Sequence, residues 1–204
     1  MLSLLAVNFG FIAIVNVKIA AQLAHAAGRD WLTGVINRGR LEQASEIVQA
    51  SSIRLGQTQA MLLMDLDKFK LINDTYGHLS GDIVIKFFAE LVAESIRGID
   101  ILGRYGGEEF CVLMPNSNEA EAFVLAQRIR EKYQTSPIFL GNKQIECTVS
   151  IGVCDSNYVG NNFKHMFEAA DKALYTAKNS GRNKVIIFSE LQVKKSATFS
   201  VIKT

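Results

Sequence analysis

The hydrophobic and polar positions of this 204-residue chain follow two different spacings. In some segments apolar residues recur every three or four positions, which is typical of a helix with one buried face. In others they run continuously or alternate with polar residues, which is typical of strands. The pattern predicts helices at 38–56, 81–97, 119–133 and 163–178, and strands at 60–64, 99–102, 110–114, 146–153 and 185–188. Because helices and strands are interspersed, the fold class indicated is α+β or mixed α/β.

The most informative run, at residues 104–110, lies between two predicted strands and reads Arg-Tyr-Gly-Gly-Glu-Glu-Phe. Two adjacent glycines predict a tight hairpin turn, since glycine takes a positive φ without steric cost. Such a hairpin makes at least one pair of strands antiparallel. Glu108 and Glu109 follow the glycines, and adjacent carboxylates call for a cation that neutralises them. Taken alone, the run is equally compatible with a solvated hairpin tip.

A second acidic pair follows the apolar segment 60–64. Asp65 and Asp67 leave the end of this predicted strand on the same side, because side chains alternate with a period of two. Carboxylate oxygens suit Mg²⁺, which is usually held by one or two carboxylates together with substrate phosphates. An Asp-x-Asp pair is weak evidence by itself. Combined with the acidic hairpin, it predicts phosphoryl or nucleotidyl transfer.

Composition narrows the class of protein further. A net charge of +2 gives no strong field for a polyanion, so no nucleic-acid partner is expected. Cys111, Cys147 and Cys154 lie in apolar segments without the spacing of zinc ligands. They are predicted to be reduced core residues, which fits a domain in the cytoplasm.

The two ends of the chain differ from the middle. Residues 1–17 carry no charged side chain, and residues 1–28 approach the roughly 20 apolar residues that cross a bilayer. We expect this segment to be a transmembrane helix or, as the competing interpretation, a signalling helix. Basic residues on its C-terminal side favour an inner-membrane location with the following domain in the cytoplasm, or a cytoplasmic protein if the segment does not span. Residues 189–204 lack a clear pattern and are predicted to be a mobile tail.

Four blocks of sequence identify a family resemblance. They are residues 30–38, residues 65–78 with Gly81-Asp82, residues 104–110 and residues 171–183. In content and order they resemble the GGDEF domain of the diguanylate cyclase family, in its Gly-Gly-Glu-Glu-Phe variant, over residues 29–188. The resemblance implies a central, antiparallel-containing sheet flanked by helices, similar to nucleotidyl cyclase and polymerase palm domains.

The resemblance also implies an activity. Two GTP molecules condense to cyclic di-GMP with release of two pyrophosphates, as each 3′-hydroxyl attacks the α-phosphate of the other nucleotide. Mg²⁺, or alternatively Mn²⁺, is the implied cofactor. Because each domain holds one GTP, the reaction implies a homodimer with two sites face to face.

By resemblance, specific residues take on roles in that reaction. Asp65, the Leu66 carbonyl and Glu108 are implied metal ligands, and Glu108 and Glu109 are the implied catalytic residues. Asn73 and Asp82 match guanine-reading positions, although Asp82 also fits a helix N-cap.

The remaining implied substrate-binding residues surround the phosphates. Lys178 and Arg182 match phosphate-contacting positions, although cations at a helix end also suit the helix dipole. The other members are Lys68, Phe69 and Lys70 at the terminal phosphates, and Gly106 and Gly107, whose backbone approaches the nucleotide.

Arg97 and Asp100 have the spacing of the Arg-x-x-Asp inhibitory site of the family, which implies that cyclic di-GMP is also an allosteric inhibitor. An exposed ion pair at a helix end is the alternative interpretation of this pair.

Two other functions compete with an active cyclase. One is a catalytically silent module that senses GTP or cyclic di-GMP, and the other is a nucleotidyl cyclase or polymerase with another substrate. The presence of Glu108 and Glu109 favours the enzyme over the silent module, and Asn73 and Asp82 disfavour another substrate.

Overall fold

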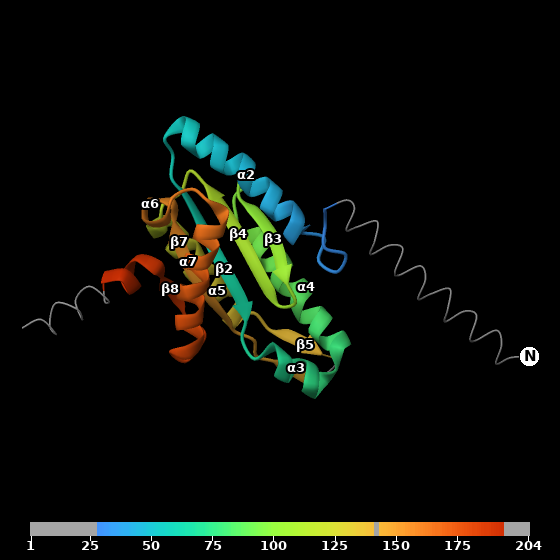
Figure 1. The fold of residues 1–204 in the computed structure, drawn as a ribbon. Coiled ribbons are helices and arrows are strands. Elements are labelled where there is room, and N and C mark those ends of the chain that lie inside the picture. The colour runs from blue at the N-terminus through green and yellow to red at the C-terminus, as the bar shows by residue number, and fades with distance from the viewer. Residues whose placement is uncertain (1–27, 141–142, 194–204) are drawn as a thin grey trace, which may run out of the picture.

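The strand at the centre of the fold is β2, Gln59–Leu66, and all of its residues are buried. The computed structural model describes residues 28–140 and 143–193, in which β2 belongs to a six-stranded sheet of order β1-β3-β4-β2-β7-β8 (Figure 1). Its flanking strands β4 (Glu109–Pro115) and β7 (Val149–Asp155) both run antiparallel to it. The middle of the sheet is therefore antiparallel, as the hairpin predicted.

The outer strands complete the sheet. β3 (Ile101–Gly106) pairs with β4 as an antiparallel hairpin. The edge strands β1 (Ile36–Asn37) and β8 (Val185–Ile187) pair in parallel with β3 and β7. A separate antiparallel pair is formed by β5 (Ile138–Leu140) and β6 (Lys143–Ile145).

Helices cover both faces of the sheet (Figure 1). The side chains of α4 and α5 join one buried cluster, and those of α2 and α7 join the other. Side chains of β2 alternate between the two clusters, which explains why its sequence is continuously apolar. The helices are α2 (Arg38–Leu55), α3 (Phe69–Tyr76), α4 (His78–Ser95), α5 (Glu119–Thr135), α6 (Ser156–Val159) and α7 (Phe163–Asn179).

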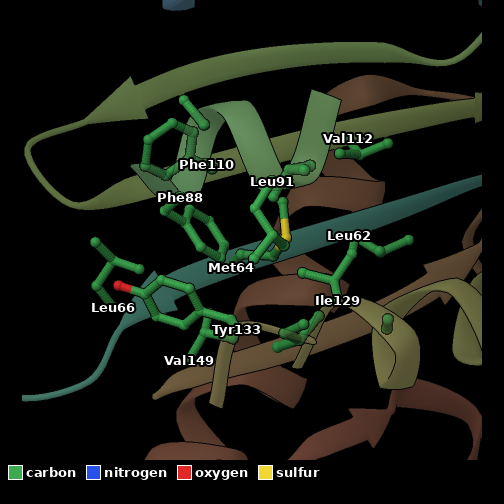
Figure 2. Close-up of a cluster of buried hydrophobic side chains, with 14 of the residues drawn as sticks. Leu62, Met64, Leu66, Phe88, Leu91, Phe110, Val112, Ile129, Tyr133 and Val149 are labelled. Carbon is green, nitrogen blue, oxygen red and sulfur yellow. The ribbon is translucent and has the colours of Figure 1, made fainter. Parts of the chain in front are cut away.

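Aromatic rings lie among the aliphatic side chains of the cluster between the sheet and α4 and α5 (Figure 2). Phe88 of α4 meets Phe110 of β4 edge to face, with ring centroids 5.1 Å apart. It meets Tyr133 of α5 in the same manner at 4.8 Å. These contacts hold the acidic hairpin's second strand against the helical layer.

The predicted helices and strands are present, but several of their boundaries differ. The strand predicted at 99–102 begins at Ile101 and continues to Gly106. The helix predicted at 81–97 begins three residues earlier, at His78, because Gly77, with φ 83°, ends α3 and separates it from α4. Asp82 therefore lies inside α4 and is not its N-cap. The strand predicted at 146–153 begins at Val149.

The predicted mobile tail does not begin at residue 189. The Ser189 amide donates to Glu119 Oε1 at 3.3 Å, and the Ser189 hydroxyl donates to the same carboxylate. Leu191 packs against the cluster beneath α7. The ordered part of the chain thus continues past β8, and residues 194–204 lie outside the described residues.

The predicted transmembrane or signalling segment falls on residues 1–27, which also lie outside the described residues. Within the described ranges, no helix is both long enough and apolar enough to span a membrane.

The close packing of α7 on β7 generates a prediction. A Cβ added at Gly152 would lie 2.0 Å from the Ala170 carbonyl oxygen and 2.4 Å from the Leu174 nitrogen, both backbone atoms that cannot rotate away. Gly152→Ala should therefore lower the free energy of unfolding by about 3 kcal/mol, measured by urea denaturation. Gly98→Ala is the matched control, since nothing lies within 4 Å of its added Cβ. Equal unfolding midpoints for the two variants would contradict the prediction.

Candidate active site

The acidic residues predicted to work together meet where β2 ends beside the β3–β4 hairpin. Asp65 is the register partner of Glu109 across the β2–β4 pair. The Leu66 amide donates to the Glu108 carbonyl at 3.4 Å, so the turn lies directly against the end of β2. Antiparallel pairing therefore brings together two acidic motifs that are about forty residues apart in sequence.

A lysine side chain supplies positive charge at this acidic edge. Lys178, in the last turn of α7, places Nζ 2.7 Å from Asp65 Oδ2. Asp65 is 8% exposed, and its burial raises the pKa of its carboxyl to about 6. The Lys178 ammonium opposes this rise in pKa, while Glu108 and Glu109 add to it. The site thus carries enough negative charge to hold a positive charge beside Asp65.

The residues present suit Mg²⁺ or a similar ion better than a structural metal ion that is held entirely by protein side chains. Over residues 28–140 and 143–193, no three histidine, cysteine or acidic side chains converge as a metal cluster. Mg²⁺ uses one or two carboxylates and takes its remaining oxygen ligands from water and substrate phosphates. Asp65, Glu108 and the Leu66 carbonyl are a donor set of that kind.

Asp67 has a different role from its neighbour. Its carboxylate accepts hydrogen bonds from the Thr148 and Ser150 hydroxyls at 2.8 and 2.7 Å, and from the Asn183 amide at 3.0 Å. These three bonds use both carboxylate oxygens for contacts within the domain. Asp67 instead anchors the turn after α7, where Arg182 and Asn183 adopt left-handed backbone conformations with φ of 62° and 48°.

This turn brings predicted phosphate-binding residues together. Lys68 and Arg182 line one cavity of about 460 Å³, with Asp67 also on its wall. Lys68 has φ 55°, so the chain turns sharply between β2 and α3. The Phe69 side chain is buried, which leaves its backbone as the group available to a ligand, and the Lys70 side chain is exposed outside this lining.

The hairpin glycines do not supply the positive φ that the sequence predicted for the turn. Neither Gly106 nor Gly107 has a positive φ, and the residues between the two strands are Gly107 and Glu108. A Cβ at Gly107 would meet nothing within 4 Å, whereas one at Gly106 would lie 3.1 Å from Glu109 Oε2. The turn conformation thus does not require these glycines, and the space beside Gly107 is open for a ligand.

An arginine holds the hairpin turn in place, and the sequence did not predict this role. Arg104 donates to the Gly107 carbonyl from Nε at 3.0 Å and from Nη2 at 2.7 Å. Its Nη1 reaches both carboxylate oxygens of Asp30, at 3.0 and 3.2 Å. Asp30 and Arg104 lie in two of the four sequence blocks, which is the signal that could have linked them.

Asp30 is itself fixed by the loop that precedes β1. It accepts hydrogen bonds from the Thr33 amide at 2.9 Å and the Thr33 hydroxyl at 2.7 Å. Burial raises the pKa of the Asp30 carboxyl, but the bonds from Thr33 and Arg104 outweigh burial and leave this pKa below its ordinary value.

The predicted guanine-reading pair lies at the corner between α3 and α4. Asn73 is on α3 and Asp82 is on α4, and both side chains are partly exposed. Gly77 forms the corner, and its amide donates to the Asn73 carbonyl at 2.9 Å. The structure therefore brings the two residues to one place, beside the start of the phosphate-binding turn.

The predicted inhibitory pair lies elsewhere, after α4. Asp100 Oδ2 accepts hydrogen bonds from the Arg97 amide at 2.9 Å and from Arg97 Nε at 3.4 Å. Asp100 is 8% exposed, whereas the Arg97 side chain is 49% exposed, so this i,i+3 ion pair is exposed on its arginine side only. Asp100 Oδ1 is buried and has no hydrogen-bond partner in the described part of the chain. Arg97 and Asp100 line a cavity of about 210 Å³. Arg128, whose role the sequence did not predict, lines it as well.

The Asp30–Arg104 pair generates a prediction about stability. Asp30→Asn keeps an acceptor for Thr33 but removes the charge that faces Arg104, whose side chain is only 13% exposed. We expect the free energy of unfolding at pH 7 to fall by about 2 kcal/mol, measured by urea denaturation.

The pH dependence of the same variant has a definite sign. Because the pKa of Asp30 is lowered by folding, its stabilisation is complete above the unfolded pKa and is lost as the pH falls through the folded pKa. The difference between wild type and Asp30→Asn should therefore shrink between about pH 5 and about pH 3. Asp171→Asn, at an exposed position of α7, is the control. A constant difference across this range would be the contrary result.

Comparison with known proteins identifies the family of this chain. The family model described as "Diguanylate cyclase, GGDEF domain" matches residues 27–184. Diguanylate cyclase A of Treponema denticola is 43% identical over 131 residues, which are 64% of this chain and 35% of that protein. The chain thus spans about a third of the length of this curated relative.

Solved structures are similar as well. The GGDEF domain of DgcB from Caulobacter crescentus, in complex with c-di-GMP, matches with a TM-score of 0.75 and 30% identity over 79% of this chain and 93% of that one. The active GGEEF domain of a diguanylate cyclase from Vibrio cholerae matches with a TM-score of 0.71 and 34% identity, over 74% and 96% of the two chains. On the four sequence blocks, the fold and these matches, the chain belongs to the GGDEF diguanylate cyclase family.

Proposed function

We propose that this protein is an active diguanylate cyclase that joins two GTP molecules into cyclic di-GMP. Each 3′-oxygen forms a bond to the α-phosphorus of the other nucleotide, each bond from α-phosphorus to pyrophosphate breaks, and two protons and two pyrophosphates leave. The observation that carries the proposal is the meeting of Asp65 with Glu108 and Glu109 at the end of β2. The Vibrio cholerae domain, described as active, carries the same Gly-Gly-Glu-Glu-Phe variant.

The proposed cofactor is Mg²⁺, with Mn²⁺ as an alternative, held by Asp65, Glu108 and the Leu66 carbonyl. GGDEF cyclases are metal-dependent, and the bound ion supplies neutralisation of charge on the phosphate oxygens and on the attacking hydroxyl. Lys178 marks the place for positive charge, because its ammonium lies 2.7 Å from Asp65. A metal ion held by Asp65 would take the place of the Lys178 ammonium, and Lys178 would then be free to contact a phosphate, which is its proposed role in the complex.

The remaining chain positions the substrate. Lys68, Lys70 and Arg182 bring positive charge to the phosphates, and Arg104 keeps the hairpin turn against the end of β2. Glu109, on the same face as Asp65, is placed to accept a proton or to orient the attacking hydroxyl. Positioning and charge neutralisation supply most of the rate enhancement in such transfers, because the protein forms no covalent bond to the phosphate.

Asn73 and Asp82 are proposed to select guanine. A carboxylate accepts from the N1–H and N2–H donors of guanine, and an amide can donate and accept on the same edge. Adenine would leave these groups unpaired, which penalises its binding.

Two sites must meet to complete the product, so we propose a homodimer in which each subunit holds one GTP. Membrane association through residues 1–28, with the domain in the cytoplasm, stays a prediction of the sequence.

The test of the activity is removal of one carboxylate. Glu108→Gln keeps the size of the side chain but loses the charge, so cyclic di-GMP synthesis from GTP and Mg²⁺ should fall by about 100-fold or more. The product is identified by chromatography and mass spectrometry, and circular dichroism checks the fold. Glu90→Gln, at an exposed position of α4, is the matched control and should keep wild-type activity.

The second candidate function is a silent sensor of GTP or cyclic di-GMP. The same assay separates the two functions, since a wild-type protein that binds GTP without forming product would be a sensor and would contradict the cyclase proposal.

We also propose that cyclic di-GMP inhibits the enzyme by binding Arg97 and Asp100. The unpartnered Oδ1 of Asp100 is an acceptor suited to guanine N1–H or N2–H, and Arg97 can pair with a guanine edge or a phosphate. Arg97→Ala should raise the concentration of cyclic di-GMP needed for half-inhibition by about tenfold, because a charge-assisted pair is lost. Arg54→Ala, which removes an exposed arginine of α2, is the control. Unchanged inhibition of Arg97→Ala would refute this site.

A further inference from the structure

The corner between α3 and α4 contains an unusually close approach. Asn73 on α3 places its side-chain amide directly over the α-carbon of Gly81 on α4. A Cβ added at Gly81 would lie 2.0 Å from Asn73 Oδ1, and 3.0 Å from both Asn73 Cγ and Phe69 Cζ. Two atoms that are not bonded cannot be as close as 2.0 Å, so only glycine leaves Asn73 where it is.

Local propensity does not explain this glycine. Gly81 lies within α4, it has no positive φ, and alanine at such a position would stabilise a helix by about 1 kcal/mol. Gly39, also within a helix, provides a contrast, since its nearest neighbour would be Asn37 Oδ1 at an ordinary 3.7 Å. The requirement at Gly81 therefore comes from the side chains across the corner.

The atom that a Cβ would strike belongs to a proposed substrate-binding group. Asn73 Oδ1 is the end of a short, partly exposed side chain, which can rotate to another position. A methyl group at residue 81 would thus be accommodated by displacement of the Asn73 amide, with a small adjustment of the Phe69 ring. The helix itself would remain.

We propose that Gly81 is a specificity-determining position of the nucleotide site. Because it lacks a Cβ, the Asn73 amide lies against α4 one residue from Asp82. The amide and the carboxylate then present one fixed pattern of donors and acceptors to the guanine edge. This inference rests on the proposed function, since it assigns to Gly81 the positioning of the proposed guanine-reading pair.

The experiment compares nucleotide binding by wild type, Gly81→Ala and Gly39→Ala. The probes are the triphosphates of 3′-deoxyguanosine, 3′-deoxyinosine and 3′-deoxyadenosine with Mg²⁺, which lack the attacking hydroxyl and so are not turned over. Calorimetry measures each dissociation constant. Gly81→Ala should bind the guanosine probe about tenfold more weakly, because it loses about one hydrogen bond, while its affinity for the adenosine probe changes by less than about twofold. Gly39→Ala should match wild type.

A second readout needs no nucleotide. When Gly81→Ala is the only substitution, the stabilisation expected from alanine in a helix is offset by the displacement of Asn73. In Asn73→Ala that obstacle is absent, so adding Gly81→Ala should raise the unfolding midpoint. The double variant should thus be more stable than Asn73→Ala, yet still fail to prefer guanosine.

The outcomes separate the inference from the proposed function. A wild-type protein without preference for the guanosine probe would overturn the proposed function and this role together. Guanosine preference in wild type that survives in Gly81→Ala, or an equal loss of affinity for all three probes, would overturn this inference alone. Additive effects of the two substitutions on stability would also overturn it, because Asn73 and Gly81 would then not be coupled.

Discussion

The constraint on which the structure depends is the burial of β2 between two antiparallel neighbours. Its side chains enter both hydrophobic clusters, so a shift of register by one residue would exchange every one of them between the two faces. The register that satisfies both clusters also pairs Asp65 with Glu109. The same hydrophobic packing that stabilises the domain therefore forces carboxylates together at one end of the sheet, where Lys178 offsets their repulsion.

This acidic edge needs support from outside the sheet, because a hairpin turn alone is free to move. Arg104 provides the support by binding the Gly107 carbonyl and Asp30 at once. Asp30 belongs to the loop that links the N-terminal segment to β1. The position of the acidic turn is thus tied to the loop before β1.

The proposed nucleotide-binding groups are organised by backbone turns that extended strands and helices cannot make. Gly77 sets the α3–α4 corner, and the left-handed residues after α7 turn Arg182 toward Lys68. Asp67 links β2 to β7 and to the turn that carries Arg182, since it accepts hydrogen bonds from Ser150 and from the Asn183 backbone amide. Structural and proposed catalytic carboxylates therefore lie two residues apart at the end of the same strand.

Much of this protein was determined by its sequence alone. The four long helices, the central apolar strand, the acidic hairpin and the family all follow from local spacing and from four ordered blocks, because neighbouring residues encode periodicity and motifs, whereas the short helices α3 and α6 were not predicted. Only the tertiary structure distinguished Asp67 from Asp65, paired Asp30 with Arg104, removed Asp82 from its predicted cap and showed why Gly81 has no side chain. Each of these depends on contacts between separate elements, whose distances are set by strand register and helix packing and not by the residues next to them in the chain.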